Sequence, residues 1–475
     1  MGTAREIIDA MRAAVPPGQE ELGTASVQRL RELTRTLLVA KAGAEEEHAR
    51  FLAIGRRELC LPEESLSNWL RGATVVVTGG TGCIGSVLMA HIAERCPARL
   101  VSLSRGITAG WPQTEGAEYR HADIRDRAAV AAVMGELKPD VVFHVAAQRS
   151  PALAEIEVHR TVTTNVLGTR NVVEAAAEAG VPQVVCASTG KALRPYSPDI
   201  YTASKRAAEW LISRAAAAGP TRYSAARFTH VVDNSIVYQR LQEWADGGVV
   251  RLHSPDIVFY AQSALESAQL LLVAGVGARA GEFRIHAITD LDWPVGLLDL
   301  ALGLLSRTGS AAPVYFSGYE RGYEEIPFPG LYDPATAGDV SPLLNAFEAA
   351  RSVRATCPMT DSFVLEMAPD PEPGKHLRAL AQVCEMTQDP QIVRSALDDL
   401  SWPLLDVALS AAPRPALARS AAMADPHRNG LGPAHQRILT AIRRHAGLAG
   451  LKPPAAPGAV RVPAGGPPPG PFRSW

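Results

Sequence analysis

The run T-V-V-V-T-G-G-T-G-C-I-G at residues 74–85 constrains the fold of this chain more than any other feature. It begins with apolar or β-branched residues, as in a buried parallel strand, and apolar residues then recur at helical spacing. Strand, glycine-rich turn and helix form the context of a dinucleotide-binding turn, although an ordinary glycine-rich turn has a similar sequence. In such a turn the glycines allow the bend, the approach of a pyrophosphate, and close packing of helix and strand, and the helix N-terminus offers free N–H groups. We assign cofactor binding here to Gly79, Thr81, Gly82, Cys83, Ile84 and Gly85.

Strands and helices alternate from this turn to about residue 228. Strands are expected at 100–104, 140–145, 183–188 and 223–227, and helices at 126–137, 157–179 and 203–218. Alternating βα units with apolar strands predict an α/β fold, a Rossmann-type doubly wound parallel sheet. Ligands of such sheets gather at the carboxyl ends of the strands.

The pattern divides the chain into five segments. We expect a helical N-terminal extension (1–72), an NADP-binding Rossmann domain (73–230), a smaller substrate-binding lobe (231–350), a helical C-terminal region (351–451) and a disordered Pro/Gly-rich tail (452–475). In the extension, Val27 to Phe51 predicts one long amphipathic helix. We interpret the extension as a helical cap or a dimerisation arm.

The end of the second strand bears on the type of cofactor. An acidic residue there usually binds the ribose 2′-hydroxyl of NAD, but this strand ends Leu103-Ser104-Arg105. A guanidinium beside a hydroxyl suits a 2′-phosphate, so we predict NADP rather than NAD. A solvated surface arginine is the alternative. Asp123-Ile124 closes the next strand, where the carboxylate could accept from an adenine amino group or serve as a turn residue.

Tyr201 and Lys205 stand four residues apart at a predicted helix start and therefore share a face. An adjacent ammonium should lower the pKa of the phenol, which could then remove a hydroxyl proton while hydride leaves the same carbon for a nicotinamide. Thr189, at the end of the preceding strand, could hydrogen-bond the reacting oxygen, and Asn165 could order water or backbone in the same site. Taken singly, Thr189 and Asn165 also fit a cap or a turn residue.

Charge and cysteine usage exclude several functions. The net charge is −2 and the pI about 6.7, so nothing predicts binding to nucleic acid or an anionic membrane. The six cysteines are scattered without zinc spacing, so we expect no metal site. No apolar run reaches a membrane span and no signal-peptide pattern begins the sequence, and we therefore expect a cytoplasmic protein.

Together these residues resemble the extended short-chain dehydrogenase/reductase superfamily. The closer resemblance is to its polysaccharide-biosynthesis branch, the UDP-N-acetylglucosamine 4,6-dehydratases. It covers about residues 59–348 and is carried by V-V-V-T-G-G-T-G-C-I-G-S (75–86), D-V-V-F-H-V-A-A (140–147), T-N-V-L-G-T-R-N-V-V-E-A-A (164–176), C-A-S-T-G-K-A (186–192), Y-T-A-S-K (201–205), A-R-F-T-H-V-V (226–232) and, more faintly, G-Y-E-R-G-Y-E-E (318–325).

The resemblance implies roles for single positions. Thr189, Tyr201 and Lys205 would form the catalytic triad, with Asn165 beside it, and Lys191 would take the sugar C5 proton. The cofactor site would add Ser104, Arg105, Asp123, Ile124, Ala146, Ala147 and Phe228, and the substrate site Gln148, Arg149, His230 and Arg321. The resemblance also implies a small-molecule substrate and a homo-oligomer, since four-helix dimers are usual in the superfamily.

The sequence departs from this branch at the position that matters for dehydration. Dehydrating members carry an aspartate between the threonine and the lysine, which protonates the departing hydroxyl, whereas this chain has Gly190. Arg149-Ser150 replaces a Lys-His pair, His230 replaces an asparagine, and residues 321–325 depart from an R-P-G-E-K loop. Two extra residues also separate Thr189 from Tyr201.

These departures predict an NADP-dependent short-chain oxidoreductase that acts on a nucleotide sugar or a related polyhydroxylated metabolite. A keto intermediate with net epimerisation or oxidation/reduction fits Gly190 better than dehydration, because elimination of water needs an acid at the leaving group. A 4,6-dehydratase with a substitute acid, such as Glu324 or a water, is one alternative. A non-catalytic NADP-binding scaffold is another.

Overall fold

A nine-stranded sheet forms the centre of the molecule. The computed structural model describes residues 3–106, 111–319, 327–336, 338–355 and 357–448. The strand order is β14-β15-β11-β6-β5-β4-β1-β2-β3. The strands are β1 (Thr74–Thr78), β2 (Arg99–Ser104), β3 (Glu118–His121), β4 (Val141–His144), β5 (Gln183–Thr189), β6 (Arg222–Phe228), β11 (Phe283–Ile288), β14 (Val353–Arg354) and β15 (Thr360–Val364). Strands β3-β2-β1-β4-β5-β6 run parallel in the doubly wound order, which confirms the predicted fold class.

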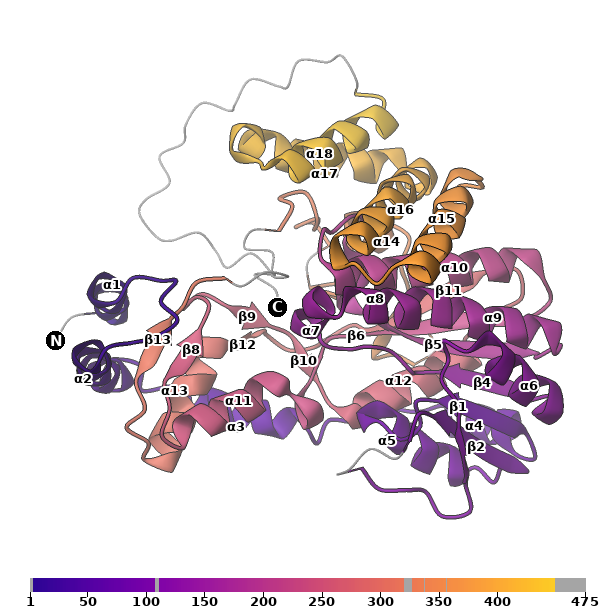
Figure 1. The fold of residues 1–475 in the computed structure, drawn as a ribbon, viewed down its shortest axis with the longest axis horizontal. Coiled ribbons are helices and arrows are strands. Elements are labelled where there is room, and N and C mark those ends of the chain that lie inside the picture. The colour runs from indigo at the N-terminus through magenta and orange to yellow at the C-terminus, as the bar shows by residue number, and fades with distance from the viewer. Residues whose placement is uncertain (1–2, 107–110, 320–326, 337, 356, 449–475) are drawn as a thin grey trace.

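Helices cover both faces of this sheet (Figure 1). Contacts join α12 to α4 and α5 on one face, and α9 to α6 and α10 on the other. These helices are α4 (Glu63–Leu70), α5 (Cys83–Ala93), α6 (Arg127–Leu137), α9 (Thr169–Glu178), α10 (Ile200–Ala218) and α12 (Ala264–Val276). Parallel strands buried on both faces explain the near-continuous apolar runs of β1, β4 and β5.

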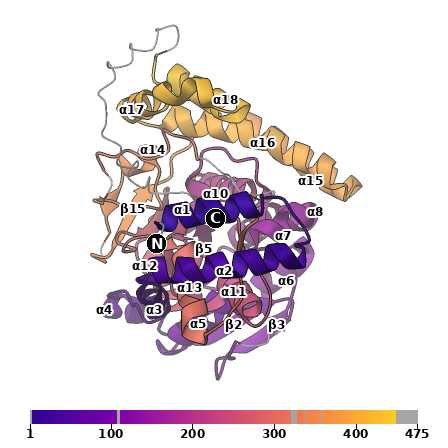
Figure 2. The ribbon, with the colours of Figure 1, turned by 90° about the vertical axis from the view of Figure 1, so that its left-hand side faces the viewer.

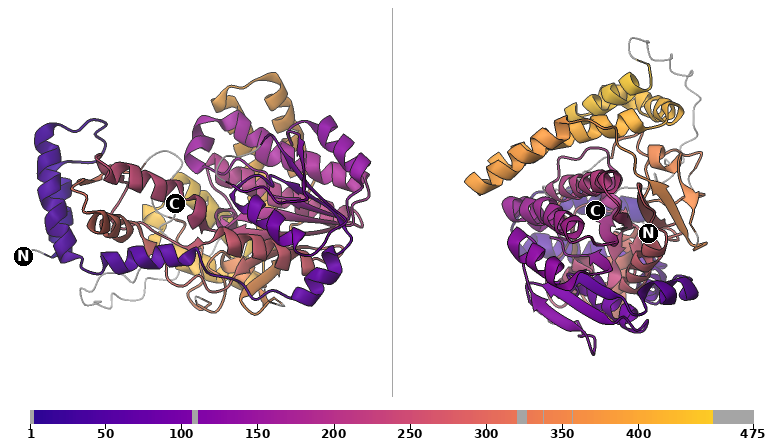
Figure 3. Two further views of the ribbon diagram at one scale, coloured as in Figure 1. Left: turned by 90° about the horizontal axis from the view of Figure 1, so that it is seen from below. Right: turned by 90° about the vertical axis from the view of Figure 1, so that its right-hand side faces the viewer.

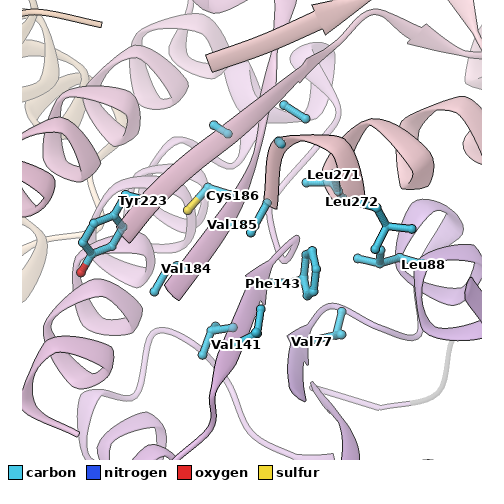
Figure 4. Close-up of a cluster of buried hydrophobic side chains, with 14 of the residues drawn as sticks. Val77, Leu88, Val141, Phe143, Val184, Val185, Cys186, Tyr223, Leu271 and Leu272 are labelled. Carbon is cyan, nitrogen blue, oxygen red and sulfur yellow. The ribbon is translucent and has the colours of Figure 1, made fainter. Parts of the chain in front are cut away.

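The core lies between the sheet and these helices. Figure 4 shows Phe143 of β4 and Leu88 of α5 with Leu271 and Leu272 of α12, and all four side chains are fully buried. Burial of each such side chain stabilises the fold by roughly 1.5–3 kcal/mol. This packing holds the strands in place, and with them the carboxyl ends of the strands where the predicted site residues lie.

A second lobe adjoins the carboxyl ends of the strands. Its elements are α11 (Ile236–Ala245), α13 (Leu297–Thr308), β7 (His230–Val231), β8 (Val250–Leu252), β9 (Val258–Phe259), β10 (Ala261–Gln262), β12 (Val295–Gly296) and β13 (Val314–Phe316). The N-terminal helices α1 (Ala4–Ala14), α2 (Thr24–Ala40) and α3 (Ala44–Ile54) share one hydrophobic cluster with this lobe. Figure 1 shows α1 and α2 at the end of the lobe away from the sheet, and α3 beside α13 on the way toward the sheet. Figure 2 views the molecule from this end, with α1 and α2 in front.

The single long helix predicted for residues 27–51 is wrong, because α2 ends at Ala40 and α3 begins at Ala44. Gly43 is the N-cap between them, and helix α3 packs on α13. A Cβ at Gly303 of α13 would collide with the carbonyl of Ala44, so the close approach of the two helices requires glycine there. The packing of α3 against α13 therefore accounts for a separate helix after α2.

The lobe boundaries also need adjustment. Strand β11 falls within the range 231–350 that we assigned to the lobe, yet it pairs in parallel with β6 in the central sheet. Strands β14 and β15 begin the region expected to be helical and extend the same sheet, because β15 pairs antiparallel with β11 and β14 pairs antiparallel with β15. The predicted tail at 452–475 lies outside the described residues.

The C-terminal region then forms α15 (Glu372–Met386), α16 (Pro390–Ala411), α17 (Arg414–Ala424) and α18 (Pro433–His445). Helices α15 and α16 share a hydrophobic cluster with α8 (Val158–Val162) and α10, and Figure 3 shows them lying across these helices. The homo-oligomer expected from the sequence stays a prediction. Within the described ranges, no helix combines the length and apolarity needed to cross a membrane.

Candidate active site

The glycine-rich turn joins β1 to α5 as the sequence predicts. Gly79 has φ +76°, and a Cβ there would lie 2.8 Å from the backbone nitrogen of Ala146. A Cβ at Gly85 would collide with the carbonyl of Gly79. Only glycine fits both positions, so the backbone is left bare where helix α5 begins. Such a bare N-terminus can receive a phosphate.

The residues predicted to bind the adenosine half lie at the ends of β2 and β3. The hydroxyls of Thr81 and Ser104 both donate to the carbonyl of Gly106, at 2.9 Å each. Arg125 pairs with the Asp123 carboxylate at 2.6 Å. Burial alone would raise the pKa of Asp123, but the hydrogen bonds from Arg125 and the charge of Arg105 lower it. Arg105 therefore lies close enough to act electrostatically at this end of the site.

Tyr201 and Lys205 lie on α10 and face the end of β5. Tyr201 hydrogen-bonds the side chain of Thr189, the last residue of β5. The Lys205 ammonium donates to the carbonyl of Ala187 at 2.8 Å. Both side chains belong to the first turns of α10, which Asp199 caps by accepting from the Thr202 amide at 2.7 Å.

The electrostatics of Tyr201 differ from the prediction. Burial raises the pKa of Tyr201 to about 12, while the hydrogen bond from Thr189 and the positive charge of Arg149 oppose this rise. We predicted a phenol pKa lowered by Lys205, and this is wrong for the structure described. Burial also lowers the pKa of Lys205.

Asn165 lies in a short π-helix, η1 (Thr163–Gly168), and is buried. Its side chain accepts from the Gln148 amide at 2.8 Å and donates to the Gln148 carbonyl at 3.0 Å. It also donates to the Ser204 hydroxyl at 3.1 Å. Asn165 thus connects the backbone after β4 to α10, one turn from Tyr201. π-Helical turns of this kind are frequent at functional sites.

The predicted substrate residues occupy the side of the site nearest the second lobe. Arg149 donates to the carbonyl and the side chain of Asn234, at 3.2 and 3.0 Å. His230 hydrogen-bonds Ser235 at 2.6 Å. Burial, followed by the charge of Lys191, lowers the pKa of His230 to about 4, so its imidazole is neutral. Arg321 and Glu324 lie outside the described residues.

Gly190 is packed against Leu343, which precedes α14 (Ala346–Ala349). A Cβ at Gly190 would lie 2.7 Å from Leu343 Cδ2 and 3.4 Å from the carbonyl oxygen of Phe228. The leucine side chain therefore fills the space in which a residue larger than glycine would begin. The next residue, Lys191, lines the same cavity as Tyr201.

One cavity of about 1360 Å³ brings these groups together. Every predicted site residue that the structure describes lines it, with the exception of Asn165. Sequence reasoning missed the side chains that reach it from distant segments: Trp111, Arg160, Arg240, Trp244, Arg251, His253, Tyr260, Leu331, Tyr332 and Leu343. Half of them come from the second lobe, which lacks a local motif. The assigned roles remain predictions, but these residues line one cavity.

The family model for polysaccharide biosynthesis proteins matches residues 75–325, which include the turn, Tyr201 and Lys205. The chain belongs to this family. The match confirms the assignment to the polysaccharide-biosynthesis branch of the extended short-chain dehydrogenases/reductases. The match ends before the C-terminal helices, and it begins after α1–α4.

Relatives in this family agree over the same part of the chain. The probable polysaccharide biosynthesis protein EpsC of Bacillus subtilis is 30% identical over 291 residues, which are 58% of this chain and 48% of that protein. A UDP-N-acetylglucosamine 4,6-dehydratase (inverting) of Campylobacter jejuni is 29% identical over 170 residues, which are 34% of this chain and 50% of the relative. A UDP-glucose 4-epimerase of Streptomyces lividans is 34% identical over 160 residues, or 30% and 47% of the two chains. The chain thus spans about half the length of these relatives.

The solved structure of Pen from Bacillus thuringiensis shows the same fold. It superposes with a TM-score of 0.51 at 20% identity, over 62% of this chain and 87% of that one. The relatives named above are a nucleotide-sugar dehydratase, a nucleotide-sugar epimerase and a probable polysaccharide biosynthesis protein.

Proposed function

We propose that this chain is an NADP-dependent oxidoreductase that acts on a nucleotide sugar or a related polyhydroxylated metabolite through a keto intermediate, as an epimerase or a dehydrogenase/reductase. The observation that carries the proposal is the convergence of Tyr201, Thr189 and Lys205 at the end of β5, in the cavity that also contains the glycine-rich turn.

The residues present fit the cofactor. Gly79 and Gly85 keep the turn free of side chains, and Ala146 and Ala147 present only methyl groups to the cavity after β4. Arg105, also on the cavity wall, would supply the donor for a 2′-phosphate. A nicotinamide bound there would accept or return one hydride at the substrate carbon. The relatives' names leave NAD and NADP open, so the choice of NADP is supported by Arg105 and by the absence of an acid at the end of β2.

Side chains of the protein would then transfer the proton of the substrate hydroxyl. As the phenolate, Tyr201 takes the proton of a substrate carbinol, and the Thr189 hydroxyl hydrogen-bonds the same substrate oxygen. In the loaded site the Lys205 ammonium, which donates to the Ala187 carbonyl, would favour this phenolate against the effect of burial. A ketone formed in this way acidifies the neighbouring C–H, which Lys191 can deprotonate from the cavity wall.

Gly190 and Leu343 favour epimerisation or net redox chemistry over dehydration. Elimination of water gains about 10²–10⁴-fold in rate from an acid at the leaving group. Residue 190 is glycine and supplies no acid, and Leu343 occupies the space beside it. The likeness to UDP-N-acetylglucosamine 4,6-dehydratases keeps dehydration as the competing outcome.

The test is incubation of the full chain and NADP with UDP-N-acetylglucosamine and UDP-glucose, followed by mass spectrometry and NMR. An isomer of unchanged mass, or a product that differs by two hydrogens, supports the proposal. Loss of one water would establish the dehydratase instead. Tyr201→Phe should abolish the new product, whereas Tyr223→Phe, in the sheet core, should not.

A further inference from the structure

Residues 190–200 connect Thr189 to Tyr201 and hold Lys191 between them. The segment begins as a 3-10 turn, η2 (Gly190–Leu193), and its last two residues are Asp199, the N-cap of α10, and Ile200, the first residue of that helix. Leu193 and Arg194 line the active-site cavity. The position of this segment therefore determines where Lys191 and the Tyr201 hydroxyl lie.

Helix α16 holds this segment at its midpoint. The Tyr196 hydroxyl donates to Asp398 Oδ1 at 2.7 Å, and the Tyr196 ring stacks on Trp402 with centroids 3.8 Å apart and planes at 20°. The Trp402 indole N–H donates to the other oxygen of Asp398 at 3.2 Å. One carboxylate thus orients both rings. The Arg437 guanidinium of α18 lies over Trp402 at 3.6 Å, so the stack has a cation on its outer face.

Further contacts secure both sides of Tyr196. Upstream, Asn345 donates to the Leu193 carbonyl at 2.6 Å. Downstream, Arg394 of α16 donates to the Pro198 carbonyl at 3.3 Å and pairs with Glu155 at 2.6 Å. Glu155 in turn accepts from the Ile200 amide at 2.9 Å.

We infer that helix α16 positions the active site from behind, because the Tyr196–Asp398–Trp402 contact holds residues 190–200. Asp398, Trp402 and Tyr196 are positioning residues: they act through the segment that carries Lys191 and precedes Tyr201. Tyr196 stands five residues from each of these two side chains, so a displacement there is passed to both. The family match ends at residue 325, so this support comes from outside it. The catalytic meaning of the inference rests on the proposed function.

Asp398→Ala tests the inference in the full chain. The variant leaves the Tyr196 hydroxyl without its acceptor, so amide hydrogen exchange should accelerate at least about tenfold at Arg194 and Ile200, whose amides are hydrogen-bonded in the segment. Asp398→Asn keeps an acceptor and should stay within about threefold of the native chain. Asp406→Ala is the matched control, because Asp406 also lies on α16 but pairs with His445 and Arg444 away from the segment.

Turnover provides a second measurement. Asp398→Ala should lower kcat about tenfold or more while the Kd of NADPH changes less than about twofold, since the glycine-rich turn is untouched. Exchange at 190–200 that is unchanged in Asp398→Ala, or changed equally in Asp406→Ala, would overturn the inference. A native chain without turnover on any nucleotide sugar would refute the proposed function, and the exchange comparison would still decide the inference.

Discussion

The Leu343 side chain occupies the place next to Gly190, 2.7 Å from where a Cβ at that position would stand. Leu343 is fully buried, and its backbone carbonyl accepts a hydrogen bond from Arg227 at 3.1 Å, which holds its backbone in place. Two residues that lie 153 positions apart therefore act as a pair, in which glycine at one position allows leucine at the other. Glycine in place of the family's aspartate at position 190 therefore removes an acid and also makes room for the Leu343 side chain.

Gly190→Asp should accordingly lower stability without creating a dehydratase. The new Cβ would collide with Leu343 Cδ2, so the buried leucine would have to move, at a cost of about 1–3 kcal/mol in the free energy of unfolding, measured with urea. The double variant Gly190→Asp/Leu343→Ala makes room for the carboxyl, and we expect it to release water from UDP-N-acetylglucosamine, detected by mass spectrometry. Dehydration by the single variant, or by the native chain, would contradict the role given to Leu343.

Arg105 should determine the preference for NADP. Arg105→Ala should weaken binding of NADPH by about 10- to 100-fold, the value of a charge-assisted contact to phosphate, and leave NADH binding unchanged. Titration of cofactor fluorescence measures both constants. Arg99→Ala is the control, since Arg99 starts the same strand and pairs with Glu118 at 2.5 Å instead. Equal affinity of the native chain for NADH and NADPH would refute the NADP assignment.

The cofactor half of the site could be predicted because each of its signals is local. A glycine-rich turn, Arg105 and the Tyr201/Lys205 pair each lie within a few residues of a strand end, and the parallel sheet brings those ends together. Leu343 and Trp402 carry no such signal, because they reach their partners only through contacts between distant segments. The pKa of Tyr201 was missed for a related reason: its value depends on burial, which a four-residue spacing does not reveal.

The buried His144 and His286 and the half-buried His230 should make the protein less stable in mild acid. Burial lowers the pKa of His144 and of His286 to about 3 and that of His230 to about 4, from an unfolded value of 6.5. Below pH 6.5 the unfolded chain binds protons that the folded chain cannot, so stability falls as pH decreases toward 4. Each histidine contributes about 1.4 kcal/mol per pH unit in this window.

His286 offers the cleanest test of this acid dependence, because neither of its ring nitrogens has a hydrogen-bond partner and it does not line the cavity. His286→Leu should reduce the loss of unfolding free energy between pH 6.5 and 5 by about 2 kcal/mol, measured in urea at each pH. The exposed His427→Leu serves as the control and should follow the native curve. Parallel curves for His286→Leu and the native chain would show that His286 does not contribute.

The ion cluster behind the site should be the most sensitive part of the fold. Arg227 is fully buried and pairs with Glu209 at 2.8 Å and with Glu348 at 2.7 Å, and Glu209 also accepts from the Ser188 hydroxyl at 2.7 Å. Arg227→Met would leave two buried carboxylates without their main partner, at a cost of about 3–5 kcal/mol in the free energy of unfolding. The exposed pair of Arg127 and Glu178 provides the comparison, and Arg127→Met should cost less than about 1 kcal/mol. Similar losses in the two variants would show that the buried cluster contributes no more than a surface pair.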